Sequence, residues 1–312
     1  MFREIDARAP ERERAEPDRG GRGSGTTMTT DGSEAGRDAL THDLDLPRGS
    51  SREPVQAQGR AYRLSGHDVR TLAAAGAFRV VPAGELTPSH ARTPTRASRD
   101  IERLQAAGLV KTTPYVVGRT RTQLVMLTDR GRDLLEAYRR PDQSQARQAF
   151  YAGDAKPREL AHDTRLHQAY LKAAERLSSR GVRVRRVVLE DELKRDYQRF
   201  LQAHNRGRSD SDGTPMRDAE AIAEWARAHQ LPYDDGHLSL PDVRLECEDV
   251  DGRLVIDDVE LVTPHYRGAH AAAKARSGFT RYRAAGARVG GSGGAGRGGR
   301  GRDARLAEEL LP

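Results

Sequence analysis

The chain has 312 residues, of which 36% are hydrophobic and 32% charged, and its formal net charge is +7. With a mean hydropathy of −0.78, part of it is expected to form no core, and the positive charge favours a polyanion such as nucleic acid. A single cysteine, Cys247, excludes an internal disulfide framework, and no apolar run reaches the roughly 18 residues that span a bilayer. These features predict a cytoplasmic protein without membrane association.

The charge is unevenly distributed along the chain. Between residues 87 and 132, nine Lys and Arg stand against three Asp and Glu, whereas between 242 and 260 eight acids stand against two arginines. We therefore expect a basic module and an acidic cluster with different roles.

Residues 1–59 mix Gly, Arg, acidic and hydroxyl residues with almost no aromatics, which predicts a disordered tail. A helical pattern begins after Tyr62, where Ser65 can act as N-cap and Val69 and Leu72 recur at helical spacing. A short second helix is expected around residues 83–87.

A third helix is predicted in TPTRASRDIERLQAAG, where Ala97, Ile101 and Leu104 form a buried stripe. The following KTTPYVVGRTRTQLVMLT is typical of two strands joined by a Gly-Arg-Thr-Arg tip, and Thr128 can cap a closing helix. This order of helices and hairpin in residues 60–140 predicts a winged helix-turn-helix domain.

Five arginines of this region are candidates for DNA contact. Arg96, Arg99 and Arg103 share the helix face away from the apolar stripe, and the hairpin tip adds Arg119 and Arg121. Such a helix can lie in the major groove of double-stranded DNA while the tip contacts phosphates or the minor groove. The alternative is that all five are solvated surface residues. The wing strand running into LTDRGRDLL resembles the MarR-like winged-helix group.

The second half is predicted to follow a polar linker at 141–161 and to occupy residues 162–285. We expect a helix at about 162–179, a strand at 182–189, a polar and partly helical insertion at 191–239, two strands in LPDVRLECEDVDGRLVIDDVELVT and a helix after Pro264. Residues 286–312 are predicted to be a Gly/Arg-rich tail that ends in a short amphipathic turn. The predicted fold class is a two-domain α+β or α/β protein with disordered termini.

Strand alternation brings two of the eight acids of this hairpin together. If the apolar faces of the two strands pack, Asp242 and Glu260 lie near each other on adjacent strands. Neighbouring carboxylates repel unless one is protonated or a cation lies between them, and a hard divalent ion accepts carboxylate oxygens. The other six acids are expected to be solvated, and an ordinary charged sheet face is the alternative for this pair as well.

Pro241-Asp242 followed by Glu260 on the next strand resembles the PD-(D/E)xK, restriction-endonuclease-like superfamily. A winged helix followed by Asp242, Glu260, Lys274 and Tyr282 resembles, more narrowly, the replication-relaxation family of plasmid and mobile-element proteins, over residues 60–285. The resemblance implies that Asp242 and Glu260 hold Mg²⁺ or Mn²⁺ and that a lysine orients the attacking water.

The chain departs from this pattern at Val262, which stands where the superfamily has its lysine. Lys274, on the predicted helix after Pro264 and seven residues before Arg281, is the candidate replacement, and a plain surface lysine is the alternative. Glu175 and Glu190 are weaker candidates for a third carboxylate.

Two functions remain open at this point. In the first, the winged helix locates duplex DNA and the second domain performs metal-dependent phosphodiester cleavage with Asp242, Glu260 and Lys274. In the second, the protein is a transcriptional or replication regulator whose second domain has lost catalysis and serves for homodimerisation or partner binding. No small-molecule ligand is indicated.

Overall fold

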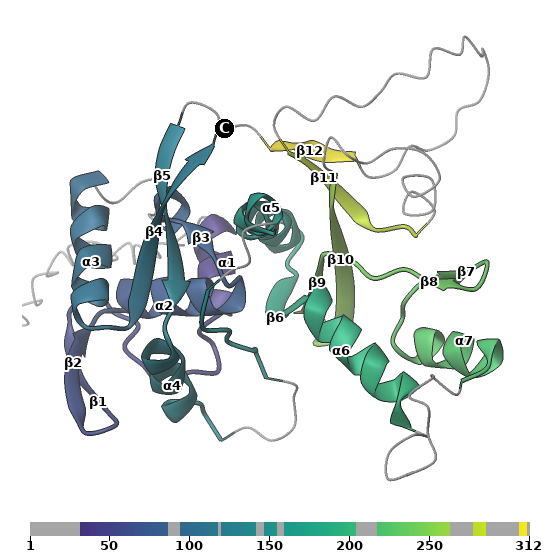
Figure 1. Cartoon of the computed structure of the whole chain (residues 1–312), viewed down its shortest axis with the longest axis horizontal. Coiled ribbons are helices and arrows are strands. Elements are labelled where there is room, and N and C mark those ends of the chain that lie inside the picture. Colours follow the sequence, from purple (N-terminus) through teal and green to yellow (C-terminus); the bar gives the residue numbers. More distant parts are fainter. Residues whose placement is uncertain are drawn as a thin grey trace, which may run out of the picture. The chain divides into compact units, whose positions relative to one another are not determined.

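The computed structural model describes residues 32–86, 94–117, 120–141, 147–154, 159–203, 217–262, 277–284 and 306–310 (Figure 1). These residues form a mixed α+β fold with several sheets. No helix among them combines the length and apolar character needed to cross a bilayer.

The described residues of the N-terminal half form four α-helices, a short 3₁₀ helix and five strands. In chain order they are α1 (Gly32–Ala39), β1 (Glu53–Ala57), β2 (Arg60–Leu64), α2 (Gly66–Ala77), β3 (Val81–Pro82), η1 (Ala83–Leu86), α3 (Pro94–Ala106), β4 (Val110–Val117), β5 (Thr120–Leu127) and α4 (Asp129–Ala137). Strands β3, β5 and β4 form an antiparallel sheet with β5 in the middle. The predicted helices and hairpin of residues 60–140 are therefore present, with a 3₁₀ turn as the second helical segment.

Local sequence explains where these helices begin. Ser65 and Asp68 form a reciprocal capping box at the start of α2, and the Thr128 hydroxyl accepts a hydrogen bond from the Gly131 amide at the start of α4. A Cβ atom at Gly131 would lie 2.2 Å from the Leu109 carbonyl oxygen, so α4 can approach β4 this closely only because residue 131 is glycine.

The prediction of a disordered tail is wrong for residues 32–59. Leu40 and Leu44, which follow α1, are each 1% exposed, and β1 pairs with β2 around a turn at Gln58 and Gly59, both with positive φ. The segment has few apolar residues, but they pack against helices that lie far along the chain. Residues 1–31 lie outside the described part.

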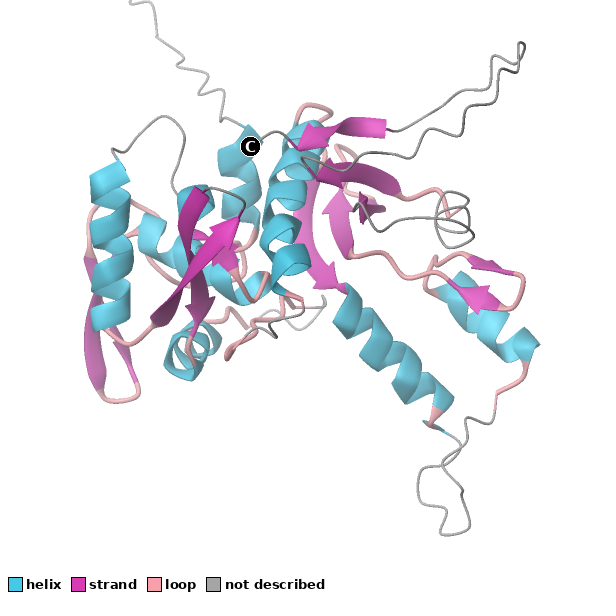
Figure 2. Ribbon diagram, turned by 45° about the horizontal axis from the view of Figure 1, so that its top comes forward, coloured by secondary structure: helices cyan, strands magenta, loops and turns pink. Residues whose placement is uncertain are grey.

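The C-terminal half has a five-stranded sheet. Its elements are α5 (Leu160–Ser178), β6 (Arg183–Leu189), α6 (Glu190–Leu201), α7 (Ala219–Ala228), β7 (Tyr233–Asp234), β8 (His237–Leu238), β9 (Val243–Glu248), β10 (Leu254–Val262), β11 (Thr280–Ala284) and β12 (Leu306–Leu310). The strand order is β12-β11-β10-β9-β6, with β6, β9 and β10 antiparallel and β11 parallel to β10. Helix α5 packs against β6 and β10 (Figure 2).

Two predictions about the C-terminal segments are wrong. Residues 280–284, expected to end a helix, form strand β11, and residues 306–310 form β12 rather than an amphipathic turn. Alternating Arg and Tyr in TRYRA suits a strand, and pairing with β10 decides between the two conformations. The intervening residues 263–276, including Lys274, lie outside the described part.

The predicted linker at 141–161 is also partly packed. Gln148 is 2% exposed, and its side chain exchanges two hydrogen bonds with the Val187 backbone on β6. Phe150 is buried against Gly76 of α2. This segment therefore ties β6 to the N-terminal half.

One hydrophobic cluster runs through both halves, from Ala39 to Tyr282, and residues 31–312 form a single compact unit. The expected helix of residues 162–179 is present as α5, and its inner face is buried at Leu166, Tyr170, Ala173, Ala174 and Leu177. The ring of Phe78 lies 5.0 Å from that of Tyr170, whose hydroxyl donates to the Gly36 carbonyl. The sequence-based domain boundaries do not coincide with a break in the core.

Candidate functional site

Helix α3 has the two faces that the sequence predicts. Ile101 and Leu104 are buried, at 6% and 1% exposed, whereas Ser98 and Arg99 are exposed. Arg96 belongs to α3, but its side chain lies outside the described part, as does the whole of Arg119. Arg121, on β5, is exposed. Among the predicted DNA contacts, Arg99 and Arg121 are thus accessible to a ligand.

Arg103 does not belong to this exposed set. Its guanidinium lies 2.5 Å from Asp68 Oδ1 and 2.7 Å from Asp100 Oδ1, and both carboxylates are buried. Arg52 binds the same Asp100 at 2.9 Å. This side chain holds α3 against the start of α2 and is 34% exposed, so DNA contact by Arg103 stays a prediction.

The two acids singled out in the β9–β10 hairpin come together. Val243 of β9 pairs with Val259 of β10. The residues next to this pair, Asp242 and Glu260, therefore lie opposite each other where the two antiparallel strands meet. Asp242 is 7% exposed and Glu260 is fully buried. The Leu261 amide donates to Asp242 Oδ2 at 2.7 Å, which fixes this carboxylate across the strand.

The other six acids of the hairpin are not all solvated, contrary to the expectation. Asp257 accepts from Arg176 of α5 and from the Thr280 hydroxyl, and Asp258 is bound by both arms of Arg244 at 2.8 Å. Glu246 and Glu248 pair with arginines of β6, and Asp249 and Asp251 lie in the turn. Five of these six acids thus pair with arginine side chains, and three of the five, Asp257, Glu246 and Glu248, pair with arginines of α5 or β6.

His162, at the start of α5, binds the outer oxygen of Asp242. Its Nε2 lies 3.2 Å from Asp242 Oδ1, and its Nδ1 lies 3.3 Å from Asp163 Oδ1. Burial disfavours the charged imidazole, but hydrogen bonds and the charges of Asp163 and Asp242 prevail and raise the pKa of His162 to about 10. Hydrophobic periodicity does not single out His162; the adjacent Asp163 was the available signal in the sequence.

These residues line a cavity of about 300 Å³, which we call the carboxylate cavity. Its wall includes Asp242, His162, Asp163, Glu190, Asp191 and Lys194. Lys194 is half exposed, and its Nζ lies 2.7 Å from Glu190 Oε2. Of the two weaker candidates for a third carboxylate, Glu190 lines the carboxylate cavity, whereas Glu175 is an exposed residue of α5.

The residues around Asp242, as arranged here, do not fit a divalent metal ion. Asp242 Oδ2 accepts from the Leu261 amide, and Oδ1 lies 3.2 Å from His162 Nε2, so neither oxygen is open to a cation unless its partner moves. Among the described residues, no three His, Cys, Asp or Glu side chains form a group that could hold a metal.

Val262 is buried at the end of β10, and Tyr282 is 1% exposed on β11, paired with Leu261. Cys247 is fully buried, as its alternation with Val243 and Leu245 predicts.

No protein-family model, curated protein or solved structure matches the chain.

Proposed function

We propose that this chain is a double-stranded-DNA-binding protein of the plasmid or mobile-element replication-relaxation type. In this proposal residues 60–140 are a winged helix, α3 is its recognition helix and the β4–β5 hairpin is its wing. The observation that carries the proposal is the division of α3 into a buried apolar face and an accessible face with Arg99, next to a hairpin with the exposed Arg121.

The role proposed for the C-terminal half is that of a nuclease-like domain that grips DNA or a protein partner, including a second copy of the chain, without cutting DNA. Its order α5, β6, β9, β10, β11, with β11 parallel to β10, supports the restriction-endonuclease-like assignment. The ion pair of His162 with Asp242 supports the absence of cleavage, because it occupies the carboxylate that would bind the metal.

A second candidate function is phosphodiester cleavage assisted by Mg²⁺ or Mn²⁺. Two observations favour it: Asp242 and Glu260 are adjacent, and Lys194 lies on the wall of the same cavity as Asp242. This candidate requires that His162 leave Asp242 when a metal binds. Lys194 then competes with Lys274 as the lysine near the attacking water.

DNA binding is tested by measuring the affinity of the full chain for duplex DNA over a series of salt concentrations. The double variant Arg99→Ala, Arg121→Ala is expected to weaken binding and to reduce the salt slope by about 2, since each phosphate contact contributes about one unit. The matched control is Arg199→Ala, at an exposed arginine of α6 that pairs with Asp196 one turn away. If the double variant and the Arg199→Ala control bind duplex DNA with the same affinity and the same salt slope, the proposal is contradicted.

Cleavage is tested with supercoiled plasmid and Mg²⁺ or Mn²⁺, using the wild type, Asp242→Asn and Lys194→Gln. Binding without nicking in all three supports the non-cleaving role. Nicking by the wild type that is lost in Asp242→Asn supports the nuclease. If Lys194→Gln nicks as fast as the wild type, the lysine that acts lies elsewhere.

A further inference from the structure

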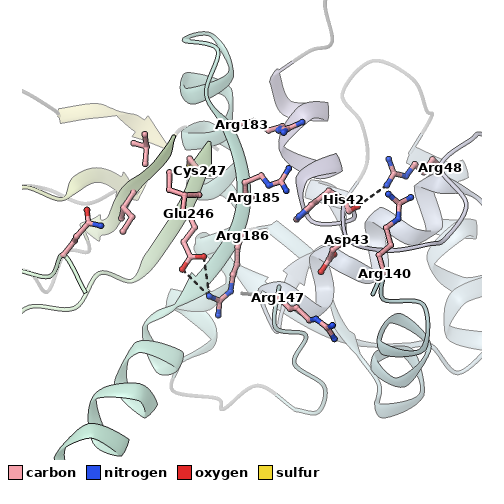
Figure 3. Close-up of a pocket in the computed structure, with 14 residues that line it drawn as sticks. His42, Asp43, Arg48, Arg140, Arg147, Arg183, Arg185, Arg186, Glu246 and Cys247 are labelled. Atoms are coloured by element: carbon pink, nitrogen blue, oxygen red, sulfur yellow. Dashed lines mark hydrogen bonds and ion pairs between the residues drawn. The ribbon is translucent and has the colours of Figure 1, made fainter. Parts of the chain in front are cut away.

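A second, larger cavity of about 650 Å³ lies away from Asp242 and is rich in arginine (Figure 3). Six guanidinium groups line it: Arg48, Arg140, Arg147, Arg183, Arg185 and Arg186. We call it the arginine cavity. The last three belong to β6, and the first three come from the N-terminal half and the segment that follows it, so residues far apart in the sequence face one another across this space.

An irregularity in β6 concentrates its arginines on the cavity. The pairing of β6 with β9 passes directly from Val184 opposite Cys247 to Arg186 opposite Glu246, so Arg185 is an extra residue in the strand. A β-bulge of this kind re-aims side chains that a regular strand would send to opposite faces. Arg183, Arg185 and Arg186 therefore all line the same cavity.

Carboxylates offset only part of this charge. Glu248 serves both Arg183, at 3.1 Å, and Arg185, at 3.6 Å. Arg186 lies between Glu246 and Glu192.

On the opposite wall, Arg48 and Arg140 are exposed, and among the described residues neither forms an ion pair with a carboxylate. Asp43, the acid of this wall, is bound at 2.7 Å by Arg139. The cavity thus keeps an excess of positive charge that solvent can reach.

One wall of the arginine cavity is apolar. Leu254, Val255 and Ile256 of β10 line it, and Leu254 and Val255 are 79% and 37% exposed. Exposed aliphatic side chains beside clustered arginines suit a ligand with an apolar ring at one end and several negative charges at the other. Arginine binds phosphate oxygens bidentately, which makes phosphate the favoured anion.

We propose that the arginine cavity binds a nucleotide, with its phosphates on the arginines and its base or sugar against β10. The volume lies within the roughly 300–1,000 Å³ that is typical of small-molecule sites. The ligand is either a free nucleoside polyphosphate or one nucleotide of a nucleic-acid strand, which share this chemistry. The proposal departs from the sequence-based expectation of no small-molecule ligand, and it depends neither on the winged helix nor on Asp242.

The test is calorimetric titration of the full chain with ATP, inorganic triphosphate, adenosine and a 5′-phosphorylated hexathymidylate. We expect ATP to bind with 1:1 stoichiometry and adenosine not to bind. The double variant Arg48→Gln, Arg140→Gln should weaken ATP binding at least tenfold. Both arginines are exposed, so the variant is expected to keep the thermal unfolding midpoint of the wild type. Arg199→Gln, the matched control, should change the affinity less than twofold.

The apolar wall is tested by Leu254→Ser, which should weaken binding of ATP but not of inorganic triphosphate. If only the hexathymidylate binds, and the double arginine variant abolishes this binding, the nucleotide belongs to a strand. The proposal is overturned if no phosphate probe binds, or if the double variant binds ATP as tightly as the wild type. It is also overturned if inorganic triphosphate binds as tightly as ATP and Leu254→Ser alters neither.

Discussion

Arg99 and Arg103 lie one turn apart on α3, and their guanidinium groups have different surroundings. Arg99 is exposed, whereas Arg103 bridges Asp68 and Asp100, two buried carboxylates. Asp68 lies 35 residues before Arg103 in the chain, so helical spacing cannot reveal this contact. At the scale of single residues, the sequence predicts which face of a helix carries arginines but not which of them another element has already engaged.

This difference predicts opposite effects of two similar substitutions. Arg103→Ala should lower the free energy of unfolding by roughly 1–3 kcal/mol, because it removes the arginine that donates to the buried Asp68 Oδ1. Arg99→Ala should change it by less than about 0.5 kcal/mol but reduce the salt slope of DNA binding by about 1. Urea denaturation and binding at several salt concentrations measure both quantities. If Arg99→Ala lowers the free energy of unfolding and Arg103→Ala does not, the roles assigned to these two arginines are refuted.

Cys247 gives a prediction about pH. Burial, and secondarily the charge of Asp257, raise the pKa of its thiol from 9.0 to about 12. The folded state therefore favours the neutral thiol: this contribution to stability is complete below about pH 9 and is lost as the pH rises towards 12.

At pH 9, alkylation of the native protein by iodoacetamide should be slower than that of the urea-unfolded chain by more than about a hundredfold, since the thiolate is the nucleophile. Mass spectrometry measures the labelled fraction. Similar rates in the two states would show that the thiol is accessible and ionised in the fold.

At the scale of elements, one arginine attaches helix α7 to the sheet. Arg244 of β9 binds both oxygens of Asp258 on β10 and donates to the carbonyls of His229 and Gln230, where α7 ends. Burial raises the pKa of Asp258 above its ordinary value, although the hydrogen bonds of Arg244 oppose the rise. The side chain thus neutralises a buried acid and caps a helix C-terminus.

Replacing Arg244 with Met should cost about 3 kcal/mol, because Asp258 then stays buried without its counterion. Hydrogen exchange should become faster in residues 219–228 in particular. Arg244→Lys is not expected to restore protection, since one ammonium cannot replace the planar fork. Arg253→Met, at an arginine exposed in the β9–β10 turn, is the control and should leave exchange unchanged. Uniform acceleration throughout the chain would argue against a local role.

Elements with strong internal patterns were predictable, and elements defined by distant partners were not. The inner face of α5 and the pairing of β9 with β10 follow from periodicity, because both bury a regular apolar stripe. Helix α1 and strand β11 are short and polar, and they owe their conformation to packing on α5 and pairing with β10. For the same reason Asp242 and Glu260 could be placed together from strand parity, whereas His162 could not.

At the scale of the whole molecule, the two halves share a core around the middle of α5. Phe78, at the end of α2, is fully buried, and its ring lies 5.2 Å from that of His167 and 5.0 Å from that of Tyr170. His167 in turn lies 3.0 Å from Glu85 of η1. We therefore expect the described part of the chain to unfold as one cooperative unit.

Phe78→Ala should destabilise the protein by about 3–5 kcal/mol. The single tryptophan, Trp225, lies on α7 in the other half, stacked on His229 at 3.9 Å. Its fluorescence transition in urea should move to lower concentration together with the far-UV circular dichroism transition. A Trp225 transition that stays at its wild-type midpoint while the dichroism shifts would indicate two independently folding domains.

The bulge in β6 makes Arg185 a residue that can be removed rather than replaced. Val184 opposite Cys247 and Arg186 opposite Glu246 would become consecutive pairs of a regular ladder if Arg185 were deleted, with every other pairing unchanged. We expect the shortened protein to keep its circular dichroism spectrum, whereas deletion of Val187, inside the regular ladder, should prevent folding. Length variation at this one position would thus be a way for related sequences to gain or lose a positive charge without altering the sheet.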